Sequence, residues 1–325
     1  MPDERPRALD LELLSNPANY AETTLTVQQQ RDLDSVGDGA TSEVYGVDDN
    51  IILKARRVFE QPDNTTHPGK QRHYAAETTY HHGMIENERG IFQLLEKNPH
   101  PNVVEAIDIS HREGLYLRKY HQVTDFIAAA TETDRIHWYR DIIQALHHIH
   151  TLGIVHSDLR KDNIFFDPQG HALIGDFGAS LQPPPIPTAF TSPVTDRADV
   201  GSLIYELETG VEVDGQDVSQ IQTGHSGLNS LIDKAWRDEY NSTAEMVADA
   251  EKLNDDRDPR RAIENALSKA ELAARVAQWR QKREEQHGMF LFCILIFDPY
   301  STGSSEYGYA DPNSRLYSLS SSNGR

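Results

Sequence analysis

Two neighbouring stretches of the sequence decide the fold. The first reads Ile154-Val-His-Ser-Asp-Leu-Arg-Lys-Asp-Asn-Ile-Phe-Phe166 and the second reads Ala172-Leu-Ile-Gly-Asp-Phe-Gly178. Between them, Asp167-Pro-Gln-Gly170 has the residue types of a tight turn. We therefore expect the apolar runs on either side to pair as a hairpin, with one polar loop before its first strand and another after its second.

The two stretches together resemble the catalytic loop and the metal-binding loop of the protein-kinase family, usually written H-R-D-L-x-x-x-N and D-F-G. Asp-Phe-Gly alone is an ordinary turn sequence, but both motifs in this order are specific. The resemblance implies that Asp158 orients and deprotonates the attacking hydroxyl, and that Asn163 and Asp176 hold Mg²⁺ beside ATP. Mg²⁺ prefers such hard oxygen ligands. Arg160, in the usual lysine position, is expected to stabilise the transferred charge.

A glycine-containing stretch nearer the start of the chain supports this interpretation. Gly37-Asp-Gly-Ala-Thr-Ser-Glu-Val-Tyr45 is similar to the family's G-x-G-x-x-G-x-V loop, whose missing side chains let the backbone cover the phosphates. Ser42 replaces the third glycine, and a lone G-x-G is more often a simple turn, so the match depends on its position in the chain. The resemblance assigns nucleotide contacts to residues of this loop: Val36, Gly37, Gly39 and Val44.

A lysine and a glutamate follow at the expected places. Lys54 ends the next predicted strand, as the family's phosphate-pairing lysine does, and Glu88 lies on the following predicted helix, where the family places its partner. Taken alone, they would be an exposed lysine and a solvated glutamate. His100-Pro-Asn-Val-Val104 resembles the family's H-P-N-I-V segment after that helix and favours the pair. We expect Lys54, held by Glu88, to position the α- and β-phosphates.

The fold that the resemblance implies is α+β and bilobal, with a small β-rich N-lobe and a larger α-helical C-lobe. Short β-prone runs from residue 36 to residue 53 predict antiparallel strands, and the helical period predicts helices over 86–96 and 131–152. Residues 60–83 are predicted to form a loop. The chain is divided into an N-terminal tail, the N-lobe, the C-lobe and an irregular C-terminal tail: residues 1–30, 31–120, 121–287 and 288–325.

Histidines are frequent, but none is predicted to bind metal. Two groups fall in the predicted loop and on the second predicted helix: His67, His73, His81 and His82, and then His147, His148 and His150. Neither group shows further ligands at the spacing of a zinc site. We interpret the first group as solvated loop residues and the second as ordinary positions of a helix.

The C-terminal third continues the resemblance and then departs from it. Asp199-Val-Gly-Ser-Leu-Ile-Tyr-Glu-Leu207 resembles the buried helix beneath the catalytic loop, so Asp199 is expected to bond to backbone near His156. Residues 228–253 resemble late helices of the large lobe. Residues 256–287 predict a charged helix packed on its own lobe. Phe290 to Phe297 is an added strand, a docking tail or a gene-model artefact.

Two departures from the family limit what the resemblance implies. Ser157 stands where many regulated kinases have the arginine that pairs with a phosphorylated activation loop, so control by a loop phosphate is not expected. The interval from Asp176 to Asp199 is short, contains Pro183-Pro-Pro-Ile-Pro187 and lacks a recognisable A-P-E sequence. In the family this interval receives a peptide substrate, so its shortness puts the binding of a protein substrate in doubt.

The amino-acid composition limits the classes of binding partner and the cellular compartment that we expect for this chain. Lys and Arg total 31 against 51 for Asp and Glu, and the net charge of −20 disfavours nucleic acid and membrane surfaces as partners. The single cysteine, Cys293, cannot form an internal disulfide, and the first ten residues lack the apolar core of a signal peptide. We expect an intracellular protein, cytoplasmic or nuclear.

The function that these expectations favour is ATP- and Mg²⁺-dependent transfer of phosphate to a protein hydroxyl. A Ser/Thr acceptor is favoured because Asp158-Leu-Arg-Lys-Asp-Asn163 resembles the D-L-K-P-E-N version of the catalytic loop. Two alternatives remain open. One is a catalytically impaired kinase-like binding module, and the other is a small-molecule phosphotransferase.

Overall fold

The computed structural model describes residues 23–28, 33–39, 42–57, 68–182, 192–213, 221–253, 267–287 and 291–296. Most of the predicted N-terminal tail and the proline run 183–187 lie outside these ranges. The chain divides into Thr24–Leu295 and a second unit made of its two ends, Met1–Thr23 and Ile296–Arg325. The architecture below is that of Thr24–Leu295.

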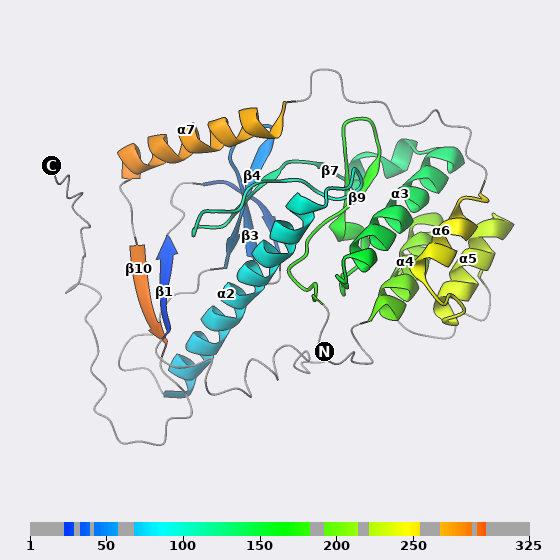
Figure 1. The fold of residues 1–325 in the computed structure, drawn as a ribbon, viewed down its shortest axis with the longest axis horizontal. Helices are drawn as coiled ribbons and strands as arrows, with labels where there is room; N and C mark the ends of the chain where they lie inside the picture. Colours follow the sequence, from blue (N-terminus) through cyan, green and yellow to red (C-terminus); the bar gives the residue numbers. More distant parts are fainter. Residues whose placement is uncertain are drawn as a thin grey trace. The chain divides into compact units, whose positions relative to one another are not determined.

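Five antiparallel strands form the sheet of the first lobe (Figure 1). Their order across the sheet is β2-β3-β4-β6-β5. The strand bounds are Ser35–Asp38 for β2, Ser42–Gly46 for β3, Ile51–Arg56 for β4, Ala106–Asp108 for β5 and Leu115–Arg118 for β6. The prediction of consecutive antiparallel strands from residue 36 onward is confirmed.

Strand β4 shows why this sheet is covered by a helix on each side. Alternate residues of a strand point to opposite faces. Ile51, Leu53 and Ala55 pack in a cluster with Leu272 and Val276 of α7 (Lys269–His287). Lys54, between them, points to the other face and reaches α2 (Pro68–Lys97). The sheet therefore lies between α2 and α7.

The position of α7 corrects one expectation. The charged helix exists, but it packs on the sheet of the N-lobe instead of on the helices that precede it in the chain (Figure 1). Polar contacts fix it there, because Arg280 bonds to Glu113 and Arg118 Nη2 donates to the Leu267 carbonyl at 2.9 Å. Leu272 and Val276, four residues apart, make the apolar stripe, but the sequence does not say which surface receives it.

The predicted loop over residues 60–83 is wrong from Pro68 onward, because α2 begins there and runs for 30 residues. His81 is 4% exposed on this helix, so its interpretation as a solvated loop histidine is also wrong. His81, Met84, Ile85 and Glu88 are all buried at helical spacing. A histidine and a glutamate in that stripe hide the apolar period from a sequence analysis.

The second lobe is mostly helical. Its helices and strands are α3 (Glu132–Thr151), α4 (Pro193–Thr209), α5 (Ser226–Trp236), α6 (Thr243–Ala250), β7 (His121–Gln122), β8 (Ile164–Phe166) and β9 (Ala172–Ile174). Helix α3 begins after Thr131, whose hydroxyl accepts from the Asp134 N–H, and ends before Gly153 at φ 76°. The α+β, bilobal expectation, the β8–β9 hairpin and the helix near 131–152 are confirmed.

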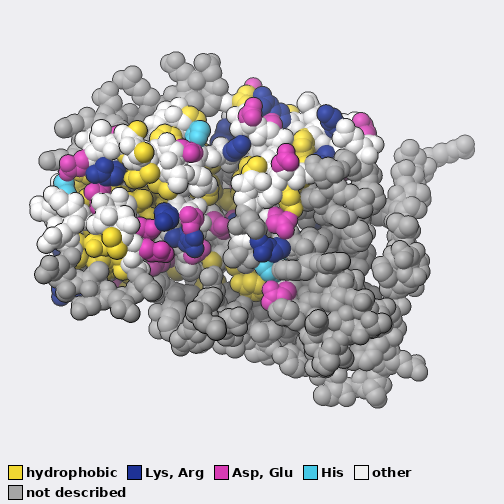
Figure 2. All heavy atoms as spheres, turned by 180° about the vertical axis from the view of Figure 1, so that it is seen from behind, with side chains coloured by type: hydrophobic (Ala, Val, Ile, Leu, Met, Phe, Trp, Pro, Cys, Tyr) yellow, Lys and Arg dark blue, Asp and Glu magenta, His cyan; other side chains and the backbone are white. Residues whose placement is uncertain are grey.

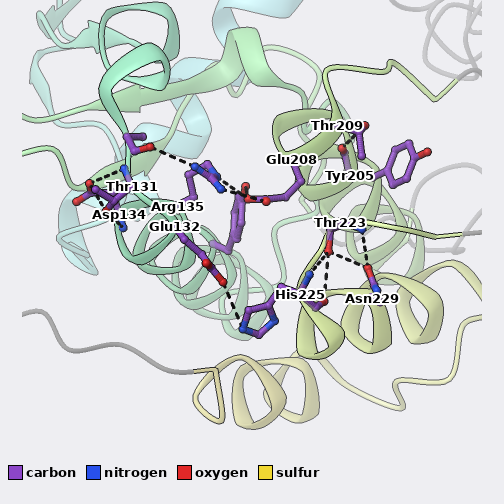
Figure 3. Close-up of polar contacts among 12 residues, drawn as sticks. Thr131, Glu132, Asp134, Arg135, Tyr205, Glu208, Thr209, Thr223, His225 and Asn229 are labelled. Carbon is purple, nitrogen blue, oxygen red and sulfur yellow. Dashed lines mark hydrogen bonds and ion pairs between the residues drawn. The ribbon is translucent and has the colours of Figure 1, made fainter.

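A polar cluster joins the start of α3 to the end of α4 and to the approach to α5 (Figure 3). Arg135 of α3 forms two hydrogen bonds to the carboxylate of Glu208 on α4, at 2.7 and 3.3 Å. Thr223 and Asn229 bond to each other beside His225, which caps α5. These bonds join α3 to α4 and order the residues that lead into α5.

A separate two-stranded sheet pairs β1 (Thr23–Gln28) with β10 (Leu291–Ile296). The structure thus shows a strand within Phe290 to Phe297, which agrees with the first of the three interpretations of that stretch. Strand β1 was not predicted, because residues 1–30 were assigned to a tail. Its alternating Thr23-Thr-Leu-Thr-Val-Gln28 is typical of a strand, but its partner lies at the other end of the sequence.

The surface and the helices add two observations. On the face drawn in Figure 2, acidic and basic side chains of the described residues lie interspersed. Within the described ranges, every helix is too short or too polar to cross a lipid bilayer.

Candidate active site

Three charged side chains meet between the sheet and the helical lobe. Lys54 Nζ lies 2.9 Å from Glu88 Oε1, 2.8 Å from Glu88 Oε2 and 2.8 Å from Asp176 Oδ1. Glu88 is buried, whereas the side chain of Asp176 is 37% exposed. The structure thus brings together three of the predicted site residues from a strand, a helix and a loop.

Local structure holds each member of this trio. Lys54 is in the middle of the sheet, paired with Val44 on β3 and with Leu115 on β6. Glu88 Oε1 also accepts the Phe177 N–H at 3.2 Å, which ties α2 to the loop after β9. Asp176 itself has φ 60°, a backbone conformation that is uncommon outside glycine. The loop is therefore set in a specific conformation beside the lysine.

A second contact between α2 and this loop was not foreseen from the sequence. Asn87 Nδ2 donates to the carbonyl oxygens of Gly178 at 3.3 Å and Ser180 at 2.6 Å. Phe177 is fully buried between the rings of Phe92 and His156, with centroids 5.6 and 5.3 Å away. Helix α2 and the loop are thus joined by hydrogen bonds as well as by apolar packing.

The charges of the trio follow from its geometry. Burial alone lowers the pKa of Lys54, but Glu88 and Asp176 raise it, and the net pKa lies above the ordinary value of a lysine. Burial raises the pKa of Asp176, but the Lys54 ammonium and the Gly178 N–H lower it by more. Lys54 is therefore a cation and Asp176 an anion at neutral pH.

Asp158 and Asn163 form the other half of the site. Asn163 Nδ2 donates to the Asp158 carbonyl at 2.8 Å and to Asp158 Oδ2 at 3.0 Å. Because the amide nitrogen of Asn163 bonds to Asp158, the amide oxygen is the atom of this side chain that can ligate a cation. The Gly175 N–H donates to the Asn163 carbonyl at 3.0 Å, which joins this loop to the loop that carries Asp176.

The acid that supports the catalytic loop is Asp196, and the expectation for Asp199 is wrong. Asp196 is 0% exposed and accepts from the His156 N–H at 2.7 Å and the Ser157 N–H at 2.8 Å. His150 Nε2 also lies 2.8 Å from its Oδ2. These bonds hold Ser157 at φ 65°, next to Asp158. Asp196 is thus a positioning residue that the sequence analysis missed.

Asp199 lies one helical turn further along α4. Burial, then the charges of Asp196 and Asp158, raise its pKa to about 7. The sequence pattern placed the start of this helix at Asp199, which is six residues too late. Ser192 and Pro193 are signals for an N-cap and a first helical residue, and α4 does begin at Pro193. With that start, Asp196 falls in the first turn beneath the loop.

The glycine-containing loop is described except at residues 40 and 41. Gly37 pairs with Val44, and Val36 is 52% exposed. The Gly39 N–H donates to the Ser42 carbonyl at 2.9 Å, and a Cβ on Gly39 would lie 3.1 Å from Ser42 Oγ. A side chain at position 39 would therefore crowd this turn, while Val36 has room to contact a ligand.

Arg160 is the predicted site residue that stands apart. It is exposed, and its guanidinium pairs with Asp162 two residues later. It lies on the same loop as Asp158, and the Asn163 N–H donates to its backbone carbonyl at 2.9 Å. Its guanidinium bonds to Asp162, and the hydrogen bonds of the described side chains do not link that group to Lys54, Asp176 or Asn163. The neighbouring Lys161 pairs with Glu206 of α4 at 2.6 Å.

These groups fit a magnesium–nucleotide complex. A carboxylate and an amide oxygen on two joined loops are ligands suited to Mg²⁺. The buried Lys54 ammonium bonds to Asp176, and the glycines at positions 37 and 39 leave the end of β2 without side chains where it pairs with β3. The donor set thus suits the binding of a triphosphate with its metal.

Comparison with known proteins agrees with this geometry. The family model described as protein kinase domain matches residues 31–197, which run from before the glycine-containing loop to one residue past Asp196. NUAK family SNF1-like kinase 2 of Rattus norvegicus is 30% identical over 201 residues, 54% of this chain and 28% of the rat protein.

Two further relatives are more distant. CBL-interacting protein kinase 22 of Oryza sativa subsp. japonica is 28% identical over 160 residues, 45% of this chain and 35% of the rice protein. Serine/threonine-protein kinase PSK1 of Saccharomyces cerevisiae is 26% identical over 109 residues, 30% of this chain and 8% of the yeast protein. The chain spans 35% or less of the length of each of the three relatives.

Proposed function

Since this chain belongs to the protein kinase family, we propose that it transfers phosphate from Mg·ATP to hydroxyl groups of proteins, with serine and threonine as the acceptors. The observation that carries the proposal is the placement of Lys54 Nζ within 2.9 Å of both Glu88 and Asp176. A buried lysine between two carboxylates from different elements is costly to desolvate, so function is a reason to retain it.

Each residue then has a defined part. Lys54, held by Glu88, binds the α- and β-phosphates, and Asp176 and Asn163 hold the magnesium ion. When bound, the metal neutralises phosphate charge and orients the transferred group. Asp158 orients the acceptor hydroxyl and takes its proton. Arg160 leaves its exposed pair with Asp162 and stabilises the transferred charge.

The acceptor is proposed from two supporting facts. The catalytic loop resembles the D-L-K-P-E-N version found in serine and threonine kinases, and one relative, of Saccharomyces cerevisiae, is named a serine/threonine-protein kinase. We propose a protein partner presented in solution inside the cell, in the cytoplasm or nucleus. The net charge of −20 supports the choice of a protein over a nucleic acid or a membrane.

The test is phosphate transfer from labelled Mg·ATP to generic protein substrates rich in serine and threonine, and to the chain itself. We expect incorporation by the wild type and a loss of at least about 100-fold in Asp158→Asn, because the acceptor loses its base. Glu251→Gln, an exposed carboxylate after α6, is the matched control and should retain activity. Equal incorporation by the wild type and Asp158→Asn would overturn the proposal.

A kinase-like binding module is the second candidate, and one observation favours it. The stretch from Asp176 to Asp196, which includes Pro183-Pro-Pro-Ile-Pro187, leaves little chain for a shelf that holds a peptide. A rise in melting temperature with Mg·ATP, with no phosphate transfer to protein or to small alcohols, would favour this candidate. Transfer to a small alcohol alone would favour a small-molecule phosphotransferase.

A further inference from the structure

A second group of possible metal ligands lies away from the candidate active site. His137 and Asp141 are one turn apart on α3, and His171 follows the turn between β8 and β9. His137 Nε2 lies 2.9 Å from His171 Nδ1, and Asp141 Oδ2 lies 3.4 Å from His171 Nδ1 and 3.7 Å from His137 Nε2. Three potential ligand atoms therefore face one another.

The distances among these atoms are those of a tetrahedral zinc site. Zinc binds histidine nitrogen and carboxylate oxygen at about 2.0 to 2.2 Å, so two ligand atoms of a tetrahedron are about 3.4 Å apart. The three observed separations of 2.9, 3.4 and 3.7 Å bracket that value. A circle through the three atoms has a radius of about 2 Å, so an ion at bonding distance from all three fits less than about 1 Å from their plane.

The backbone around the cluster holds the ligands in place. Trp138 Nε1 donates to the Gly170 carbonyl at 2.9 Å, which fixes the turn on α3. Asp167 Oδ1 accepts the N–H of His171 at 2.9 Å, and Asp141 Oδ2 accepts the N–H of Ala172 at 3.1 Å. A site preformed in this way needs little rearrangement to bind an ion.

The burial of the three side chains and their ligand types favour zinc over magnesium and calcium. The side chains of Asp141 and His171 are less than 10% exposed, and that of His137 is 13% exposed, so one edge of the cluster reaches solvent. Imidazole nitrogens suit zinc, whereas magnesium and calcium take oxygen ligands. Two histidines and one carboxylate leave the fourth tetrahedral position for water, which can enter at the exposed edge.

We propose that His137, Asp141 and His171 bind one Zn²⁺ ion that fastens the β8–β9 hairpin to α3. Phe166 pairs with Ala172 at the turn end of this hairpin, and Ile164 pairs with Ile174 at its open end. Asn163 directly precedes β8 and Asp176 comes shortly after β9, so both lie at the open end and the zinc site is separate from the proposed magnesium ligands. An ion at the turn holds the strands whose other ends carry the catalytic loops.

The first experiment measures zinc content. The purified chain is stripped with a chelator, incubated with a slight excess of ZnSO₄ in buffer without nucleotide or magnesium, desalted and analysed by mass spectrometry of the metal. We expect about one zinc ion per chain for the wild type and less than about a tenth of this for His137→Asn and His171→Asn. His147→Asn, on the same helix and outside the cluster, should retain the zinc of the wild type.

The second experiment keeps the proposal testable if a variant folds poorly. Co²⁺ added to the stripped wild type should give visible absorption bands of tetrahedral cobalt, and Zn²⁺ should remove them by displacement. Zn²⁺ should also raise the melting temperature of the wild type and of His147→Asn, but not that of His171→Asn.

Several results would overturn the proposal. A wild type that takes up no zinc shows that the three side chains form a hydrogen-bonded network instead, since 2.9 Å between the two histidine nitrogens also fits a direct hydrogen bond. Zinc uptake that persists in both His137→Asn and His171→Asn assigns the metal to other histidines. Neither readout depends on phosphate transfer, so the proposal can fail while the proposed function holds.

Discussion

Asp176 and Asp196 both follow the loop of Asp158 in the sequence, and they are held in opposite ways. Asp176 is partly exposed and bonds to the ammonium of Lys54 from the other lobe. Asp196 is fully buried and accepts two backbone N–H groups and His150 within its own lobe. Asp176 is held by the charge of Lys54 and stays accessible to solvent. Asp196 is held by hydrogen bonds from the backbone N–H groups of His156 and Ser157. We therefore expect Asp176 to govern activity and Asp196 to govern stability.

The largest effect should separate the two acids by activity. Asp176→Asn removes the charge of the proposed magnesium ligand, so we expect phosphate transfer to fall by about 10³-fold, or roughly 4 kcal/mol of transition-state stabilisation. Its free energy of unfolding should change by less than about 1 kcal/mol, because Lys54 keeps Glu88 as a partner. Steady-state kinetics and urea denaturation measure the two quantities. A variant that is fully active but unstable would reverse the assignment.

The second prediction concerns stability. Asp196→Ala leaves the buried N–H groups of His156 and Ser157 without their acceptor, so we expect a loss of about 3 kcal/mol in the free energy of unfolding. Asp196→Asn keeps one oxygen at the same place and should lose less. Urea unfolding followed by tryptophan fluorescence gives both values. If the alanine variant were as stable as the wild type, the backbone of this loop would not depend on Asp196.

The third prediction tests the charge of the inter-lobe trio. Glu88→Gln keeps the shape of the side chain but removes its charge, so Lys54 would be drawn toward Asp176 and away from the phosphates. We expect activity to fall by about 10- to 100-fold, which is about 1.4 to 2.7 kcal/mol. Glu86→Gln, an exposed glutamate on the same helix, is the control and should stay within a few-fold of the wild type. Equal losses in the two variants would point to damage of α2 as a whole.

The smallest effect concerns Asp199 and pH. Burial and the nearby charges of Asp196 and Asp158 raise its pKa to about 7 in the folded protein, so the folded state holds this proton more tightly than the unfolded chain does. This carboxyl therefore costs the wild type stability as pH rises from about 4 to about 7. Asp199→Asn does not titrate. The full rise in pKa corresponds to about 4 kcal/mol, but the side chain is only half-buried and water screens its charge, so the advantage of the variant should grow over that interval to about 1 to 2 kcal/mol and level off above it.

Urea unfolding of the wild type and Asp199→Asn between pH 4.5 and pH 8 checks this dependence. Asp49→Asn, an exposed carboxylate in the turn before β4, provides the control and should show a constant difference from the wild type. An advantage of Asp199→Asn that shrinks with rising pH would contradict the sign.

The sequence by itself determined the parts of this protein that depend on short-range order. The spacing of Asp158, Asn163 and Asp176 around a predicted hairpin specified two adjoining loops, because a hairpin brings the residues that flank it together. The extent of α3 followed from the helical period over residues 131–152, and its ends are set locally by the cap at Thr131 and by Gly153. The pairing of Lys54 with Glu88 also followed, although only by resemblance to a family.

Tertiary structure alone decided which surfaces meet. The apolar stripe of α7 fits many surfaces, and the packing of the first lobe selected the sheet face of Ile51 and Leu53. Asp196, and not Asp199, bonds to the backbone of His156 because the first turn of α4 lies beneath a loop that is 40 residues earlier in the sequence. The meeting of His137 and Asp141 with His171 likewise needs a helix and a hairpin to pack together. Such contacts are set by the packing of whole elements, which short-range sequence patterns do not specify.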